Sequence, residues 1–141
     1  MIIRKAKKED LNVISKIFAE ESAKPPYNQK WTDKTALNKF REGLRNQDIF
    51  AIELERKIIG LITFNKTSDK KKRYLDEFWI KKECQGQGFG KEVMKFVERF
   101  YKSKGVKKIE LVANRRANAF RFYKKLNYTE DNDLVFMNKK I

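Results

Sequence analysis

The feature that most constrains the fold of this chain is a glycine-rich loop between two regular elements. Gly86, Gly88 and Gly90 directly follow a stretch of strand character and directly precede a helical pattern. Because glycine has no side chain, several backbone N–H groups of such a loop can approach one anion closely. A helix N-terminus adds unpaired N–H groups and a partial positive charge. The loop is therefore predicted to bind a pyrophosphate, with Lys91 as an added cation; a glycine-rich helix start without a ligand is the alternative.

Two other phosphate-binding motifs fit this loop less well. A P-loop requires Gly-Lys followed by Ser or Thr, whereas Glu92 follows Lys91 here. A Rossmann fingerprint spaces its glycines as G-x-G-x-x-G in the first strand–helix unit. This chain has G-x-G-x-G, and hairpin-like strands come before it.

Hydrophobic periodicity predicts one mixed α+β domain that covers residues 1–141. Helices are predicted after a cap at Asp10, after Thr32-Asp33, from Phe89 to Lys104, and over Ala117–Leu126. The first has apolar positions Leu11, Ile14, Ile17 and Phe18, and the second Leu37, Phe40 and Leu44. Strands are predicted at Ile2–Ala6, Ile49–Leu54, Lys57–Asn65, Tyr74–Lys81, Ile109–Ala113 and Asp133–Asn138. The order β-α-α-β-β-β-α-β-α-β indicates antiparallel hairpins followed by a parallel crossover.

Two sequence motifs, one after the other along the chain, resemble the signatures of one protein family. Gln85-x-x-Gly88-x-Gly90 resembles the Q/R-x-x-G-x-G/A motif of the GNAT N-acetyltransferases, which binds the pyrophosphate of acetyl-CoA. The stretch from Asn118 through Tyr123 to Tyr128 resembles the family's second signature, with Asn127 where the family usually has Gly; Lys82 stands where many members have Pro. The resemblance covers nearly the whole chain. It implies a mostly antiparallel sheet of six to seven strands with about four helices, splayed between the strands Tyr74–Lys81 and Ile109–Ala113.

The resemblance also implies a reaction, in which an acetyl group moves from acetyl-CoA to a primary amine by direct attack in a ternary complex. An N–H near Ile80 would stabilise the thioester carbonyl, and Tyr123 would protonate the leaving thiolate. Packing in the core is the alternative role for Tyr123. The implied cofactor-binding residues are Phe78, Trp79, Ile80, Gln85, Gly86, Gln87, Gly88, Phe89, Gly90, Lys91, Asn118 and Tyr123.

The chain contains no histidine, which excludes an imidazole base, a Ser-His-Asp triad and a histidine metal ligand. A carboxylate or a water relay must then take the proton of a protonated amine, and Glu77 is the first choice. Asp76 is expected on the opposite face of the strand. A solvated strand charge is the alternative for Glu77.

The acceptor site is expected between the first two helices, because the family forms it there. Tyr27 and Trp31 in this loop suit a flat or cationic group, and Glu77 would complete the site. Both aromatic residues could equally cover the edge of the core. Glu20 and Glu21, at the end of the first helix, are a second set of candidates for a cationic amine.

The net charge of the chain suggests alternative functions. The chain has 34 Lys+Arg against 19 Asp+Glu, a net charge of +15 that favours anionic partners. A basic nucleic-acid-binding module and a non-catalytic acyl-CoA-binding protein are therefore the rival functions. The lysines are spread along the chain and no nucleic-acid-binding motif is visible, so we expect no nucleic-acid partner.

The remaining expectations concern compartment, metal and assembly. A single cysteine, Cys84, excludes an internal disulfide and a cysteine zinc site, so we expect no metal. No apolar run approaches a membrane span, and a cytoplasmic location is expected. The sequence does not give the oligomeric state; dimers are common among members of the family, and the strand from Asp133 is the candidate interface.

Overall fold

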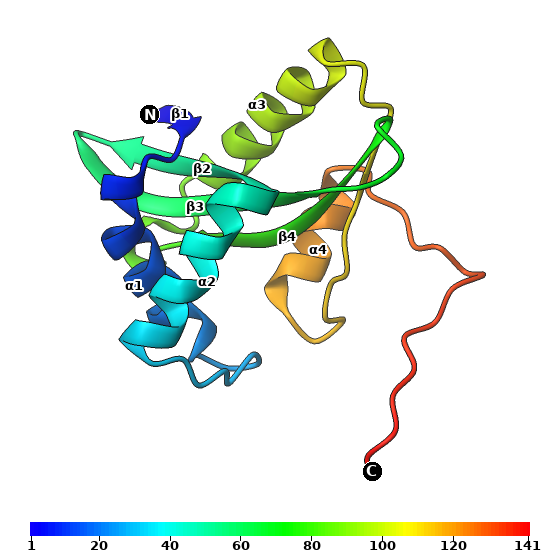
Figure 1. Cartoon of the computed structure of the whole chain (residues 1–141). Coiled ribbons are helices and arrows are strands. Elements are labelled where there is room, and N and C mark those ends of the chain that lie inside the picture. The colour runs from blue at the N-terminus through cyan, green and yellow to red at the C-terminus, as the bar shows by residue number, and fades with distance from the viewer.

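The computed structural model describes all 141 residues of the chain. Its elements are β1 (Ile2–Lys5), α1 (Leu11–Ser22), α2 (Asp33–Asn46), β2 (Gln47–Leu54), β3 (Lys57–Lys66), β4 (Lys72–Ile80), α3 (Phe89–Ser103), β5 (Lys108–Glu110) and α4 (Asn118–Lys125). Short 3-10 turns at Lys8–Asp10 and Lys82–Cys84 precede α1 and the glycine loop. The predicted order of elements is confirmed as far as α4 (Figure 1).

The strands form one open sheet in the order β1-β2-β3-β4-β5. The first three pairs are antiparallel, and β4 pairs with β5 in parallel. This parallel pairing joins only Lys72–Tyr74 to Lys108–Glu110. Because β4 runs on to Ile80, the two strands part beyond Tyr74 and leave a fork in the sheet.

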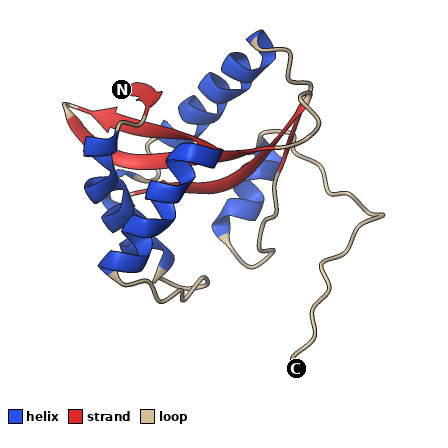
Figure 2. Ribbon diagram, viewed as in Figure 1, coloured by secondary structure: helices blue, strands red, loops and turns tan.

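Helices cover both faces of the sheet (Figure 2), and an apolar core lies between the sheet and each layer of helices. Helices α1 and α2 cover one face, and all four predicted apolar positions of α1 are buried there. Helices α3 and α4 cover the other face through Val93, Val97, Tyr101 and Tyr123, among others. Side chains of β4 alternate between these cores, so that Phe78 packs with α4 and Trp79 packs with α1.

Two details of the first helices differ from the predictions. The buried stripe of α2 is Ala36, Phe40 and Gly43, while Leu44 is 37% exposed. The Asp10 carboxylate does not cap α1, because it accepts hydrogen bonds from the Arg4 guanidinium and from Lys7 N–H instead.

None of the four helices has the length and apolar character that a membrane crossing requires.

The predicted number of strands is wrong, since the sheet has five rather than six or seven. Residues 133–138 form no strand, and the chain after α4 leads away from the body of the molecule (Figure 1). The apolar pattern of this segment suits a strand, but the segment pairs with no strand of the sheet. Strand β5 is also shorter than predicted and ends at Glu110.

Candidate functional site

The glycine loop, residues 85–90, connects the end of β4 to α3. Its backbone is left-handed at Gly86 and Gly88, with φ of 76° and 86°. A Cβ atom added at either position would meet nothing within 4 Å. The two glycines are therefore required by backbone conformation rather than by packing.

Backbone N–H groups gather at this loop. From Gly86 to Lys91 none of them donates a hydrogen bond within the chain, and the first bond of α3 runs from Glu92 N–H to the Gly88 carbonyl at 3.2 Å. Residues 85–88 of the loop and Lys91 are exposed. Successive free donors at a helix N-terminus, beside a lysine, match the acceptor oxygens of a pyrophosphate.

Side chains of the loop hold it in place. The Gln85 amide donates to the Ile80 carbonyl at 2.7 Å, and the Gln87 amide donates to the Glu83 carbonyl at 3.3 Å. The Phe89 side chain packs against the core. Of the cofactor-binding residues predicted here, these three would therefore act through their backbone, because their side chains already have partners within the protein.

Helix α4 packs closely against the start of α3. A Cβ on Gly90 would lie 3.2 Å from the Phe122 ring, so only glycine allows this approach without a shift. The Phe122 and Phe78 ring centroids are 6.1 Å apart. Asn118 opens α4 and is exposed. The fold thus brings the two sequence motifs and the end of β4 to one place.

Tyr123 lies on the inner face of α4 and is only 8% exposed. Its ring packs against those of Phe122 and Tyr128, with centroids 5.1 and 5.6 Å away. Burial raises the pKa of Tyr123 well above its usual value, and the nearby Tyr27 and Glu77 raise it further. The hydroxyl therefore keeps its proton at neutral pH, and the ring packs in the core.

The carboxylates of Asp76 and Glu77 lie on the same side of the sheet, which corrects the prediction that they point to opposite faces. Thr63 pairs with Glu77 and Phe64 pairs with Leu75, so Asp76 is the extra residue of a β-bulge. A bulge interrupts the alternation of side chains. Both carboxylates consequently approach the Lys39 ammonium of α2.

Lys39 bridges these two carboxylates. Its Nζ atom lies 3.6 Å from Asp76 Oδ2 and 3.5 Å from Glu77 Oε1. The indole N–H of Trp79 donates to Glu77 Oε2 at 2.5 Å. Burial raises the pKa of Glu77, although these two partners oppose the shift. Glu77 is thus a partly desolvated carboxylate of increased basicity.

Aromatic side chains surround this carboxylate. The Tyr27 and Trp79 ring centroids are 4.9 Å apart, and Trp31 packs edge-on against Phe18 at 5.0 Å. Burial, followed by the charge of Glu77, raises the pKa of Tyr27. The predicted acceptor residues therefore contact the same aromatic cluster, while also covering the edge of the α1–α2 core.

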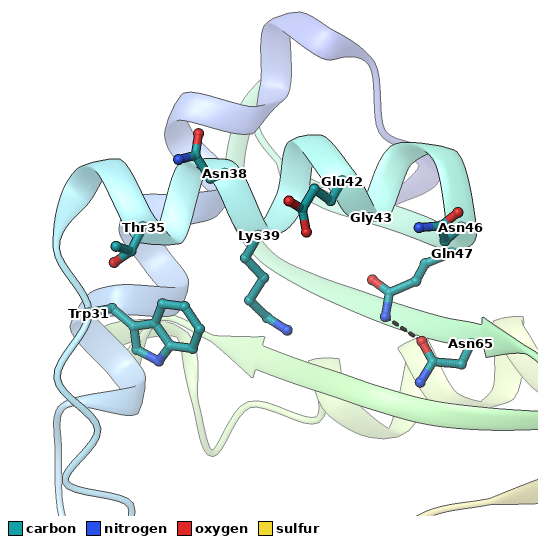
Figure 3. Close-up of a pocket in the computed structure, with 9 residues that line it drawn as sticks. All are labelled: Trp31, Thr35, Asn38, Lys39, Glu42, Gly43, Asn46, Gln47 and Asn65. Atoms are coloured by element: carbon teal, nitrogen blue, oxygen red, sulfur yellow. Dashed lines mark hydrogen bonds between the residues drawn. The ribbon is translucent and has the colours of Figure 1, made fainter.

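A polar cavity of about 590 Å³ opens beside Lys39, between α2 and the strands β2 and β3 (Figure 3). Its lining contains one hydrophobic residue and several amides: Trp31, Thr35, Asn38, Lys39, Glu42, Gly43, Asn46, Gln47 and Asn65. The Gln47 amide also donates to Asp76 at 3.0 Å and so connects the cavity to the two carboxylates. Apart from Trp31, sequence reasoning missed this lining, because isolated amides and lysines carry no recognisable spacing.

The other candidates lie apart from this cluster. Glu21 pairs with Lys24 and Glu20 is exposed, and neither lines the cavity. Cys84 is half-buried as a free thiol in the turn before the glycine loop.

Comparisons with known proteins identify the family and the fold. Residues 13–128 match the model of the acetyltransferase (GNAT) family. No curated protein matches the chain. Among solved structures, one described as a possible acetyltransferase from Clostridium difficile 630 superposes with a TM-score of 0.84 at 17% identity, over 99% of this chain and 97% of that one.

Two further similar structures contain the expected ligand class. A PaiA N-acetyltransferase from Thermoplasma acidophilum in complex with coenzyme A has a TM-score of 0.72 at 23% identity, over 89% of this chain and 87% of that one. A predicted acetyltransferase with acetyl-CoA from Clostridium acetobutylicum has a TM-score of 0.70 at 21% identity, over 97% and 95%. These identities show a shared fold, and the family model covers most of the chain. The chain therefore belongs to the GNAT family of acetyltransferases.

Proposed function

We propose that the protein transfers an acetyl group from acetyl-CoA to a primary amine. The observation that carries this proposal is the series of free N–H groups from Gly86 to Lys91, placed beside the fork between β4 and β5. These donors would hold the pyrophosphate, and the unpaired end of β4, from Phe78 to Ile80, would hold the pantetheine arm. When bound, acetyl-CoA supplies an activated acetyl thioester.

The residues of the chain then have separate tasks. Glu77 Oε1 takes a proton from the acceptor ammonium, and the hydroxyl of Tyr123 supplies a proton to the departing sulfur. The Ile80 N–H donates to the carbonyl oxygen of the thioester. Because burial raises the pKa of both Glu77 and Tyr123, the first is a stronger base and the second holds its proton.

The amine would enter from the side of α2, next to Tyr27 and Trp31. The position of Lys39 supports this direction, because its own ammonium lies beside the carboxylates of Asp76 and Glu77. A substrate ammonium of similar size has the same chemistry to bind there. The amide-lined cavity beside it suits an acceptor whose body carries hydroxyl or amide groups.

Calorimetry with acetyl-CoA, followed by a thiol-release assay, tests the proposal. The wild type should bind acetyl-CoA, and Gly88→Glu should abolish binding, since it places a negative charge at the loop. A panel of polyamines, aminoglycosides, amino acids and peptides should then reveal an acceptor. Absence of binding by the wild type would refute the proposal. Binding without turnover for any amine would favour the non-catalytic acyl-CoA-binding alternative.

A further inference from the structure

A group of exposed lysines lies at the end of the sheet where β3 turns into β4. These lysines come from three segments that are separate in the sequence: the β3–β4 hairpin, the C-terminal end of α3, and the residue before β5. None of them forms a salt bridge in the structure. The lysine cluster consists of Lys66, Lys70, Lys71, Lys102, Lys104 and Lys107.

Backbone hydrogen bonds hold the three segments together. The N–H groups of Lys107 and Lys108 both donate to the Lys71 carbonyl, at 2.7 and 3.1 Å. From there β4 and β5 pair in parallel, beginning with Lys72 opposite Lys108. Figure 1 shows the β3–β4 hairpin beside the connection from α3 to β5. The fold itself therefore gathers these positive charges, although the sequence keeps them apart.

Few acidic groups oppose the charge of the lysine cluster. Its three segments contain one acidic residue, Asp69, whose carboxylate accepts a hydrogen bond from the Lys71 N–H at 2.9 Å. Glu110 of β5 is shared between the ammonium groups of Lys72 and Lys108, at 3.5 and 3.4 Å, so two more cations face this one carboxylate. This end of the molecule is therefore strongly positive and suits an anionic partner.

The lysine cluster lies far from the proposed site of acetyl transfer. Strand β4 begins beside the cluster at Lys72 and ends near the glycine loop at Ile80. Eight steps along a strand, at about 3.3 Å each, separate these two ends by about 26 Å. Coenzyme A phosphates held at the glycine loop would leave the cluster free, so its ligand is a second anion.

The side chains around the lysine cluster favour a duplex over other anionic surfaces. No large apolar residue of these segments is exposed, whereas binding to a membrane surface or as a peptide groove uses such anchors. The nearby Phe64 and Tyr101 rings are buried, and the Lys104 ammonium covers the half-buried Phe100 ring at 5.6 Å. These rings therefore provide no platform on which the bases of a single strand could stack.

We propose that the lysine cluster binds the phosphate backbone of a double-stranded nucleic acid, and that it does so independently of sequence. Lysine ammonium groups contact phosphates without reading base edges. The expectation that the protein has no nucleic-acid partner rested on the spread of lysines along the chain, and the fold removes this objection. Such binding would keep the acetyltransferase close to acceptors that are themselves bound to nucleic acid.

Fluorescence anisotropy with short labelled DNA and RNA duplexes of several sequences tests the proposal. The wild type should bind all sequences alike, and six phosphate contacts predict a slope of about −5 for log affinity against log salt with DNA. Lys70→Gln with Lys71→Gln and Lys107→Gln should flatten this slope by about 3 and weaken binding ~10²-fold or more near 0.1 M salt. The DNA and RNA arms show which duplex the cluster prefers, and binding of either one supports the proposal.

A matched triple variant separates the lysine cluster from the general charge of the protein. Lys16, Lys34 and Lys57 are exposed lysines of α1, α2 and the far end of β3, and they form no salt bridge. Their change to glutamine removes the same charge and should lower the slope by less than one unit. Both triple variants should bind acetyl-CoA as the wild type does, because the glycine loop is unchanged.

Three results would overturn the proposal. The first is an absence of duplex binding by the wild type at about 0.05 M salt, where phosphate contacts are strong. The second is an equal loss of affinity in the two triple variants. The third is tighter binding to phosphatidylserine vesicles or to a polyglutamate peptide than to either duplex. Each of them leaves the proposed acetyl transfer untouched, since acetyl-CoA binding is measured separately.

Discussion

Alanine at Gly88 and at Gly105 should cost the same stability but only the first should weaken coenzyme A binding. The two glycines flank α3 and have nearly equal φ, 86° and 84°, with nothing within 4 Å of an added Cβ. A left-handed conformation costs alanine ~1–2 kcal/mol, and the smaller entropy of the unfolded chain offsets part of that. We expect a net loss of about 1 kcal/mol for each variant, and a melting temperature lowered by about 3–5 °C.

The binding effect follows from the position of each glycine. The methyl group of Gly88→Ala would project into open space at the loop whose N–H groups are free, whereas Gly105 lies at the far end of the helix. Losing one hydrogen bond to a charged phosphate costs ~1.5–3 kcal/mol, which corresponds to about 10- to 150-fold in affinity. Calorimetry should therefore show a weakened Gly88→Ala and a Gly105→Ala equal to the wild type. Equal affinities of both variants would show that the loop does not hold the phosphates.

Three further predictions concern acids and bases. Glu77→Gln should lower kcat by ~10²–10⁴-fold and remove the acid limb of the pH–rate profile. In the wild type this limb falls as the pH drops through the raised pKa of Glu77. Asp76→Asn should keep the acid limb, and loss of the limb in both variants would argue against a single base. Tyr123→Phe should slow thiol release while unfolding stays cooperative, and an unchanged rate would rule the hydroxyl out as the acid. Arg4 holds the pKa of Asp10 below its usual range, so Asp10 stabilises the fold above pH ~3.9 and this stability is lost as pH falls. Asp10→Asn should therefore cost ~1–2 kcal/mol in urea unfolding at pH 7 and nothing near pH 2; a cost that persists at pH 2 would contradict this linkage.

Local features were predictable because they depend on neighbouring residues alone. The apolar spacing of α1 and the glycines before α3 act within a few residues, and the structure contains both as expected. The antiparallel pairing of β2 with β3, and of β3 with β4, follows from short connections between adjacent segments. The buried stripe of α2 was harder to predict, because Ala36 and Gly43 are small residues that are buried by the segments packed against them rather than by their own hydrophobicity.

The candidate site depends on contacts between distant segments. The bulge at Asp76 arises from the register of β4 against β3, and it reverses the direction that simple alternation predicts for this carboxylate. Lys39 reaches both carboxylates because α2 crosses the sheet above them. No spacing in the sequence encodes either fact, and Lys39 lies more than 30 positions before both carboxylates.

The sequence by itself determined the family, the helix that follows the glycine loop, and the absence of a histidine base, because motifs and composition are properties of the chain alone. Tertiary structure alone decided that both carboxylates lie beside Lys39 and that residues 133–138 form no strand. The apolar pattern from Asp133 to Asn138 is typical of a strand, but a strand forms only where the free edge of another strand can pair with it. In one chain that pairing is not made, and residues 134–137 remain exposed.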